Sequence, residues 1–192
     1  FYNNSENIKK TIDIYDEKLS LSANKIFEKR AEFLSDFIPI FKKRYKQLSN
    51  DKESVELTYK SDISKTQNLN ELLKNNLEKD LRFQYTTKGI HKDDLIFTIK
   101  DFSVKKFGSQ GQQKTFLISL KLAQFDYLSR LKSNPILLLD DIFDKLDDNR
   151  VKQIINLVNE DKFNQIFISD TNKTRSENII KMVNKSYKIF EI

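Results

Sequence analysis

The sequence predicts an α/β fold in which a helical N-terminal part precedes a sheet whose strands alternate with helices. Residues 5–49 carry apolar side chains at spacings near three and four, as amphipathic helices do. The run "ILLL" (136–139) has no polar side chain, which favours a strand buried on both faces, as in parallel sheets. Strand and helix patterns alternate from residue 136 onward, which indicates a parallel or mixed sheet.

The first part of the chain, residues 1–82, is expected to be a lobe of long amphipathic helices with one short strand. Pro39 lies inside the first helical pattern and predicts a kink or a new helix start. This helix could pack on a globular head, pair with another helix, or act as a DNA-binding arm. The alternation in "SVELTYKS" (54–61) predicts a half-buried strand, and residues 68–82 return to helical spacing.

The second part, residues 83–192, is expected to hold the sheet. A turn followed by a strand is predicted at 85–101, and 104–107 is a short second strand that closes a hairpin. A long helix begins near 111 and meets no breaker before Pro135. After the strand at 136–139, the expected elements are a helix (149–160), a buried strand (164–169), a helix (175–184) and a final strand (186–192).

Composition limits the possible functions. The chain has 192 residues, of which 38% are hydrophobic and 32% charged, enough for a core surrounded by exposed helices. Cysteine is absent, which excludes disulfides and thiolate metal sites and fits the cytoplasm, where we expect the protein. No apolar run approaches the ~18 residues of a membrane span. The polar first residues lack a signal peptide, and because no Met begins the chain we expect a fragment or a processed chain.

The net charge of +6 suits a polyanionic partner such as nucleic acid, or a lysine-rich surface that serves solubility. Charge alone leaves both interpretations open. The only glycines are Gly89, Gly108 and Gly111, and no pair of them has the spacing of G-x-x-x-x-G-K-[ST]. This chain therefore does not hold its own Walker A loop.

Two aspartates, Asp140 and Asp141, follow the apolar run at the point where the strand should end. Ligands of open α/β sheets bind outside the carboxyl ends of the strands. Carboxylate oxygens suit Mg²⁺, which takes one or two of them along with water and phosphate. Strand alternation would point the second carboxylate the other way, where it could orient a water. The alternative is that the two aspartates cap the next turn.

The stretch "FGSQGQQK" (107–114) places Gly, Ser and Gly directly before the long helix. A helix N-terminus presents unpaired N–H groups and the positive end of the dipole, which attract phosphate. Ser109 adds a hydroxyl donor. An ordinary N-cap serine explains the same pattern.

These stretches together resemble one family. "GSQGQQK", followed by "ILLLDDIFDKLD", resembles the signature loop, Walker B strand and D-loop of ABC/SMC-type ATPase heads. The wording is closer to the RecF DNA replication and repair family: "TTKGIHKDDL" resembles its T-T-x-G-P-H-R-D-D-L stretch, and "FEKRAEFLSDFIPIF" resembles the helix of its second lobe. The resemblance covers nearly the whole chain. It implies half of an ATPase head, a P-loop NTPase-like sheet with flanking helices plus an N-terminal helical lobe, without the Walker A part.

The family implies a function for the complete protein. ATP is sandwiched in a head-to-tail homodimer, between the Walker A loop of one subunit and the signature loop of the other. DNA is bound at single-stranded gaps or at junctions of single and double strands, together with RecO- and RecR-type proteins, in replication, repair and the SOS response to DNA damage. The resemblance implies a weak, DNA-stimulated ATPase that uses ATP and Mg²⁺. The chain alone is expected not to hydrolyse ATP.

The resemblance also implies roles for individual residues. Asp140 would hold Mg²⁺ through water, and Asp141 would be the catalytic carboxylate that positions the attacking water. The signature residues that contact the γ-phosphate in trans would be Ser109, Gln110, Gly111 and Gln112. The D-loop at the dimer interface would be Asp144, Lys145, Leu146 and Asp147.

The sequence departs from the family pattern at two further places. Where ABC heads often carry a switch histidine, this chain has Asp170, Thr171 and Asn172, so Asp170 and Thr171 are only candidates for that position. Ile90 stands where the family usually has proline.

His91 is the only histidine. It could be a general base, or it could have a structural or interface role beside Asp93 and Asp94. A single histidine cannot build a zinc site, and no other residues here supply the missing ligands.

A hypothesis from another class is a non-catalytic DNA-binding or protein-interaction module of an SMC-like protein. Phe102 and Phe107, near Lys105 and Lys106, could support a DNA surface or belong to the core. Binding driven by phosphate contacts would fall steeply with salt and would not depend on nucleotide. A pure coiled-coil arm is excluded by the α/β pattern after residue 134.

Overall fold

The computed structural model describes residues 2–64, 67–131, 134–144, 146–160, 162–183 and 186–191. The chain divides into two compact units, each made of two segments: Phe1–Asp36 with Leu57–Ile96 (unit 1), and Phe37–Glu56 with Phe97–Ile192 (unit 2). Each unit therefore takes segments from early and later parts of the chain. The functional division into 1–82 and 83–192 stays a prediction.

Helix α1 spans Tyr2–Ser49 and contains Pro39 in its interior. Of the two alternatives expected at Pro39, the new helix start is therefore wrong, and the kink stays a prediction. A proline inside a helix removes one backbone hydrogen bond and crowds the preceding turn. Around Pro39, however, the side chains of Phe37, Ile40 and Phe41 are buried. Burial of these apolar side chains favours a helix that continues through the proline.

Unit 1 is built on a small apolar core. Helix α2 (Leu69–Phe83) begins at Asn68, whose side chain accepts a hydrogen bond from the Glu71 N–H, and this confirms the helix predicted at 68–82. A short 3₁₀ helix, η1 (Ile90–Lys92), precedes strand β2. The buried residues of this core are Ala23, Ile63, Leu69, Leu72 and Leu73.

A three-stranded sheet has the order β1-β2-β3, with β1 at Val55–Lys60, β2 at Asp94–Ile99 and β3 at Phe102–Ser103. β2 and β3 are antiparallel, and the two residues between them, Lys100 and Asp101, have φ values of 47° and 68°. Two positive φ values in succession are typical of a tight type I′ hairpin turn. The strands predicted at 54–61 and within 85–101 are confirmed.

The second strand of this hairpin was predicted at 104–107, and that position is wrong. Residues Val104–Phe107 form one helical turn, α3, closed by the Gly108 N–H on the Val104 carbonyl at 3.0 Å. The turn at Lys100 and Asp101 pairs β2 with Phe102–Ser103 instead, so the hairpin ends before residue 104. Val104 is the buried residue that anchors α3.

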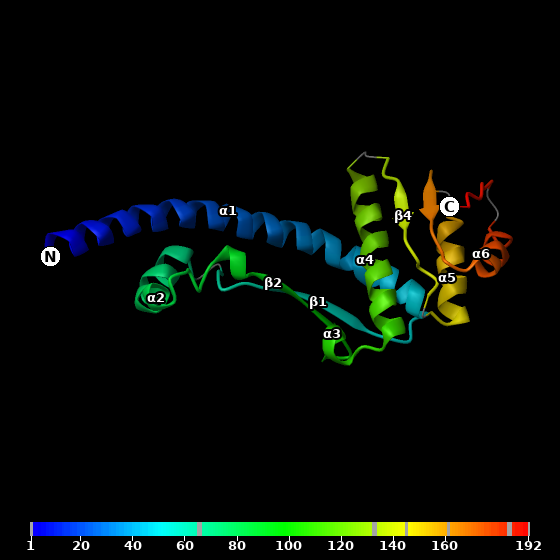
Figure 1. Cartoon of the computed structure of the whole chain (residues 1–192), viewed down its shortest axis with the longest axis horizontal. Helices are drawn as coiled ribbons and strands as arrows, with labels where there is room; N and C mark the ends of the chain where they lie inside the picture. Colours follow the sequence, from blue (N-terminus) through cyan, green and yellow to red (C-terminus); the bar gives the residue numbers. More distant parts are fainter. Residues whose placement is uncertain are drawn as a thin grey trace. The chain divides into compact units, whose positions relative to one another are not determined.

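The carboxyl-terminal part of unit 2 contains a parallel strand pair flanked by helices (Figure 1). β4 (Leu137–Leu139) pairs in parallel with β5 (Ile166–Ile168), with Leu138 opposite Phe167. The helices are α4 (Gln110–Arg130), α5 (Asp148–Val158) and α6 (Lys173–Ile180). The parallel pairing and the order of these elements confirm the α/β prediction.

One core joins these elements. Ile118, Leu122 and Phe125 from α4 meet Leu137 and Leu139 from β4 in a single buried cluster. The same cluster includes apolar residues of α5, Phe163, and Ile179 of α6. The first and third residues of β4 thus fix the strand against the core, and its carboxyl end is held in place.

Two predictions about the strands are wrong. β4 and β5 are not buried on both faces: Leu138 is 64% exposed and Phe167 is 49% exposed. In the described part of the chain this sheet has only two strands, and the core covers one face of it. Residues 186–191 were expected to form a strand, but they are in no strand there. Ile192 and Asn184, at the ends of the predicted final strand and helix, lie outside the described residues.

Candidate functional site

The carboxyl end of β4 is tied to the carboxyl end of β5. The Ser169 N–H donates to the Leu139 carbonyl at 3.0 Å, and the Asp141 N–H donates to the Ser169 carbonyl at 3.1 Å. Backbone pairing therefore continues past both strands and brings Asp140, Asp141 and Ser169 together. The predicted position of the two aspartates, at the end of a parallel strand, is where the structure has them.

Asp141 leaves the strand conformation. Its φ is 45°, and its N–H also lies 3.1 Å from the Ser169 hydroxyl. Because β4 ends at Leu139, the left-handed backbone, and not the strand alternation we expected, sets the position of the second carboxylate. The Lys114 ammonium, on α4, donates to the Asp141 carbonyl at 2.5 Å. This hydrogen bond links Asp141 to the first turns of α4.

The Asp141 carboxylate is poorly satisfied. Its Oδ1 is buried and has no hydrogen-bond partner among the described residues. Buried carboxylate oxygens normally have a partner, because leaving one without costs about 1–3 kcal/mol. An oxygen in this state fits a water or a ligand atom that completes the site.

Asp140 differs from its neighbour. It is exposed, and its Oδ1 accepts a hydrogen bond from the Ser169 hydroxyl. One carboxylate at this edge is thus open to solvent and the other is partly enclosed. No cluster of three or more His, Asp or Glu side chains that could hold a metal occurs among the described residues. Mg²⁺ needs only one or two protein carboxylates when phosphate and water complete its shell, so the pair fits Mg²⁺ in that form.

The signature segment, residues 109–112, forms the N-terminus of α4. The Ser109 hydroxyl accepts from the Gln112 N–H at 3.2 Å, and the Ser109 N–H donates to Gln112 Oε1 at 2.8 Å, which makes a capping box. The N-cap interpretation is therefore correct as local structure. It does not exclude phosphate binding, because Ser109 and Gln110 are exposed and a hydroxyl that accepts here keeps its proton to donate elsewhere.

The predicted D-loop, residues 144–147, leads into α5. Asp147 is the N-cap of α5 and accepts a hydrogen bond from the Arg150 N–H at 2.9 Å. Leu146 packs against the core of unit 2, and Asp144 is half-buried. Lys145 lies outside the described residues. For Asp147, capping is thus an observed role, and the interface role of the segment stays a prediction.

The candidate switch residues have different surroundings. Asp170 accepts hydrogen bonds from Arg175 Nε at 3.0 Å and the Ser176 hydroxyl at 2.9 Å, and its side chain is only 2% exposed. The Arg175 guanidinium lowers the pKa of Asp170 to about 2, so the carboxylate is ionised at neutral pH. Arg175 also donates to the Phe143 carbonyl at 3.2 Å. Asp170 is committed to this ion pair, whereas Thr171 is exposed.

No sequence pattern indicated that four further residues belong to this region: Lys114, Ser169, Arg175 and Glu53. Lys114 and Ser169 contact Asp141 across 27 and 28 positions of the chain, and Glu53 is linked to Arg150 across 97. Spacing patterns report neighbours on one element and carry no signal for pairs this far apart. Ser169 was expected only as the last residue of the strand at 164–169.

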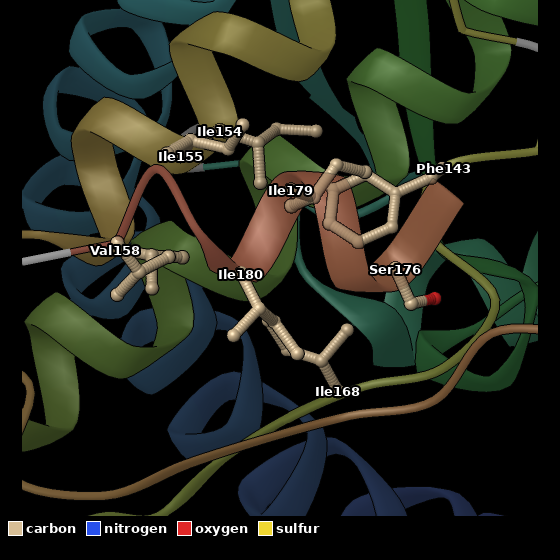
Figure 2. Close-up of a pocket in the computed structure, with 9 residues that line it drawn as sticks. Phe143, Ile154, Ile155, Val158, Ile168, Ser176, Ile179 and Ile180 are labelled. Atoms are coloured by element: carbon tan, nitrogen blue, oxygen red, sulfur yellow. The ribbon is translucent and has the colours of Figure 1, made fainter. Parts of the chain in front are cut away.

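An apolar cavity lies under α6 (Figure 2). Its lining includes Phe143, Ile154, Ile168 and Ile179, and its volume is about 50 Å³. Ser176 also faces it, but the hydroxyl is hydrogen-bonded to Asp170. Sites for small molecules usually measure about 300–1,000 Å³. This cavity is therefore a packing gap beside the candidate site and gives no reason to expect a bound cofactor there.

His91, in unit 1, is exposed, and its Nε2 lies 3.0 Å from the Thr86 carbonyl. The neighbouring Asp93 is buried and pairs with Arg30 at 3.0 Å and with the Tyr59 hydroxyl. The carboxylate beside His91 is thus taken up by other side chains, and the histidine has a backbone contact. This arrangement favours the structural interpretation of His91 over the general base.

The fold and the site define a class. A parallel strand that ends in two aspartates, beside a long helix whose capped N-terminus carries the signature pattern, is part of an ABC/SMC-type ATPase head. Solved structures agree on the fold. An SMC head bound to the C-terminal winged-helix domain of ScpA superposes with a TM-score of 0.50 at 15% identity, over 86% of this chain and 43% of that chain.

Within this class the chain is similar to RecF. The RecF–ATPrS and RecF–ATP structures, described as a recombination mediator protein in the RecFOR pathway, match with TM-scores of 0.71 and 0.67 at 27% and 29% identity. They cover 86% and 85% of this chain, and this chain covers 46% of each.

Curated relatives carry the same name. The "DNA replication and repair protein RecF" of Flavobacterium johnsoniae is 51% identical over 183 residues, which are 95% of this chain and 51% of that protein. That of Phocaeicola vulgatus is 46% identical over 93% of this chain and 48% of its own length. The chain thus spans about half the length of its relatives, and it fits the C-terminal portion of RecF. No family model matches the chain. In the described part, every helix is too short or too polar to cross a membrane.

Proposed function

We propose that this chain supplies the signature segment and the Walker B carboxylates of a RecF-like DNA-repair ATPase. The observation that carries the proposal is the buried, unpartnered Oδ1 of Asp141 at the end of β4. A structural carboxylate normally has a donor on at least one of its two oxygens, as Asp93 has on Oδ2. An oxygen that is enclosed but unsatisfied suits a group that orients a water beside a phosphate.

Each residue has a role in this proposal. Asp140, which is open to solvent, would hold Mg²⁺ through water, and Asp141 would position the attacking water. The Lys114 ammonium on the Asp141 carbonyl, and the left-handed backbone, keep the carboxylate in place before nucleotide arrives. A bound Mg²⁺ would neutralise charge on the phosphates, which is a main part of catalysis in phosphoryl transfer.

The signature segment would serve the nucleotide of a second subunit. The exposed Ser109 and Gln110, with the N–H groups at the start of α4, would contact the γ-phosphate in trans. Residues 144–147 would cross the dimer interface as a D-loop. The Walker A loop of the sandwich would come from outside this chain, because this sequence has none.

The partners follow from the named relatives. Since they are DNA replication and repair proteins of the RecFOR pathway, we propose that the complete protein binds DNA at gaps or junctions and acts with RecO- and RecR-type proteins. Its basic net charge is compatible with this. The SOS response and the cytoplasmic location stay predictions.

An ATPase assay tests the proposal. The purified chain alone should show no ATP turnover, and a complete protein that joins it to a Walker A segment should turn ATP over weakly. In that complete protein Asp141→Asn should retain ATP and stabilise the dimer, with turnover reduced about 100-fold or more. Asp101→Asn, which removes an equal charge from an exposed turn away from the candidate site, is the control. Steady turnover by the isolated chain, or normal turnover in Asp141→Asn, would refute the assignment.

A second candidate function has one observation in its favour. Phe102 and Phe107 are 64% and 70% exposed and contact each other edge to face with ring centroids 6.0 Å apart. The interpretation of these rings as core residues is therefore wrong. Together with the exposed Lys105 and Lys106 they offer a stacking surface with positive charge, as proteins that bind single-stranded nucleic acid use.

Salt and nucleotide separate the two functions. If unit 2 is a non-catalytic nucleic-acid module, the isolated chain should bind a labelled single-stranded oligonucleotide without ATP, and affinity should fall steeply as salt rises. Phe102→Ala together with Phe107→Ala should weaken that binding at constant salt. If the double variant binds the oligonucleotide as tightly as the wild type, the second candidate function is wrong.

A further inference from the structure

Glu53 occupies the connection between α1 and β1. The chain reaches it through Asn50 and Asp51, whose φ values of 54° and 60° are left-handed. The Glu53 side chain is turned inward and only 14% exposed. A carboxylate buried to this extent is stable only if charged or polar donors surround it.

Three donors from three helices converge on this carboxylate. The Tyr45 hydroxyl of α1 donates to Oε2 at 2.5 Å, Gln112 Nε2 of α4 to Oε1 at 3.0 Å, and Arg150 Nη2 of α5 to Oε1 at 3.2 Å. Burial raises the pKa of Tyr45, and the hydrogen bond to Glu53 raises it further, so the phenol stays protonated and keeps donating. The carboxylate is the one acceptor that these donors share.

The contact to Gln112 supports the signature segment. Gln112 Oε1 accepts the Ser109 N–H at 2.8 Å, so the amide must turn its Nε2 the other way, toward Glu53. The Gln112 side chain is thereby held at both ends. Glu53 thus fixes the residue that closes the capping box around Ser109.

The contact to Arg150 supports the D-loop. The Arg150 N–H is bonded to the Asp147 carboxylate at 2.9 Å, and Arg150 Nε lies 3.7 Å from the same carboxylate. The Arg150 side chain is 17% exposed. The position of Asp147 at the end of the D-loop is therefore linked to Glu53 through a single arginine.

We infer that Glu53 is a positioning residue that couples the signature segment to the D-loop. The inference rests on the proposed function, in which both segments face the same second subunit. Each is a loop that enters a helix, and separate loops would fluctuate independently. A shared carboxylate holds them at a fixed spacing, so that a partner meets one preorganised surface. Glu53 touches neither phosphate nor metal in this scheme.

Hydrogen exchange of the isolated chain tests the coupling directly. Glu53→Gln should raise amide exchange about tenfold in both segments, 109–113 and 147–151, while the core helices keep their protection. The matched control is Glu56→Gln, which removes an equal charge from a nearby exposed pair with Lys42. It should leave both segments unchanged. Equal acceleration everywhere would mean that Glu53 only stabilises the fold, and a change in one segment alone would also overturn the inference.

A second variant covers the case in which Glu53→Gln does not fold. Arg150→Gln alters only the D-loop side, yet it should raise exchange in 109–113 about threefold, because Glu53 loses a partner and holds Gln112 less firmly. A purely local role of Arg150 would leave that segment unchanged. That result would contradict the coupling.

The complete protein supplies a functional measurement. Glu53→Gln should weaken ATP-dependent self-association about tenfold, and ATP binding by the monomer should be unchanged, since the Walker A loop lies elsewhere. If the unmodified protein shows no ATP-dependent self-association, the proposed function is wrong. The hydrogen-exchange experiment then still shows whether Glu53 couples the signature segment to the D-loop. If the unmodified protein associates and Glu53→Gln associates equally well, the positioning role is wrong.

Discussion

Two buried carboxylates, one in each unit, have an oxygen without a partner, and their surroundings differ. The side chain of Asp93 in unit 1 is 2% exposed. Its Oδ1 is unpartnered among the described residues, but its Oδ2 accepts from Arg30 and from the Tyr59 hydroxyl. Asp141 in unit 2 makes its hydrogen bonds to the described residues through its backbone. Asp93 is thus neutralised by a cation within the fold.

The difference separates a carboxylate that is paired within the fold from one for which we propose a role toward a ligand. Lys114 contacts Asp141 only at its backbone carbonyl. The pKa of Arg175 is raised mainly by Asp170 and only in smaller part by Asp144 and Asp141. Asp170 is therefore the main ion-pair partner of the Arg175 guanidinium at this edge of the sheet. The Oδ1 of Asp141 keeps no hydrogen-bond partner among the described residues.

The largest effect is expected at Asp93. Asp93→Ala should lower the free energy of unfolding by about 1–3 kcal/mol, because Arg30 and Tyr59 lose their shared acceptor. The estimate is moderate because the Arg30 side chain is 45% exposed and water can partly replace the carboxylate. Urea denaturation followed by circular dichroism measures the loss. Asp94→Ala, at the exposed neighbouring position, should change stability little, and equal losses in both variants would remove Asp93 from its structural role.

A smaller effect is expected at Asp170 and depends on pH. Its pKa in the fold is about 2, below the ordinary value of 3.8, so it contributes stability above the ordinary value. That contribution, at most about 2 kcal/mol, is lost as pH falls from about 5 to about 2. Denaturation of the wild type and Asp170→Asn across this range should show the two curves converging at low pH. Parallel curves would show that Arg175 does not stabilise this carboxylate.

The smallest effect on stability is expected at Asp141. Asp141→Asn should change the free energy of unfolding by less than about 0.5 kcal/mol, or raise it, because it removes a partly buried charge whose Oδ1 has no hydrogen-bond partner among the described residues. The same denaturation experiment measures it. A loss as large as that of Asp93→Ala would mean that Asp141 is a structural residue, and the contrast between the two carboxylates would disappear.

The sequence was informative where a function depends on neighbouring residues. The apolar run before Asp140 located the strand end, and the small residues before the long helix located the capped N-terminus at Ser109. It was uninformative about Glu53, Lys114 and Arg175, since each acts on residues brought near by the fold. The sequence also predicted the second hairpin strand at the wrong residues. The tight turn at Lys100 and Asp101 pairs β2 with Phe102–Ser103, and the spacing of apolar residues carries no information about where such a turn falls.

The burial of β4 was mispredicted for a related reason. An apolar run shows that a strand prefers to be covered, but not which chain segment covers it. Leu137 and Leu139 meet the core, whereas Leu138 faces away from it. The pattern alone could not tell these two situations apart.

The uncovered side of the β4–β5 pair has a practical consequence. Ile136, Leu138 and Phe167 are 54%, 64% and 49% exposed, next to strand edges that are unpaired in the described chain. Exposed apolar side chains beside unpaired strand edges favour association with further copies through those edges. Solutions of the isolated polypeptide should therefore become polydisperse as the protein concentration rises. Leu138→Lys should raise the protein concentration up to which the solution stays monodisperse.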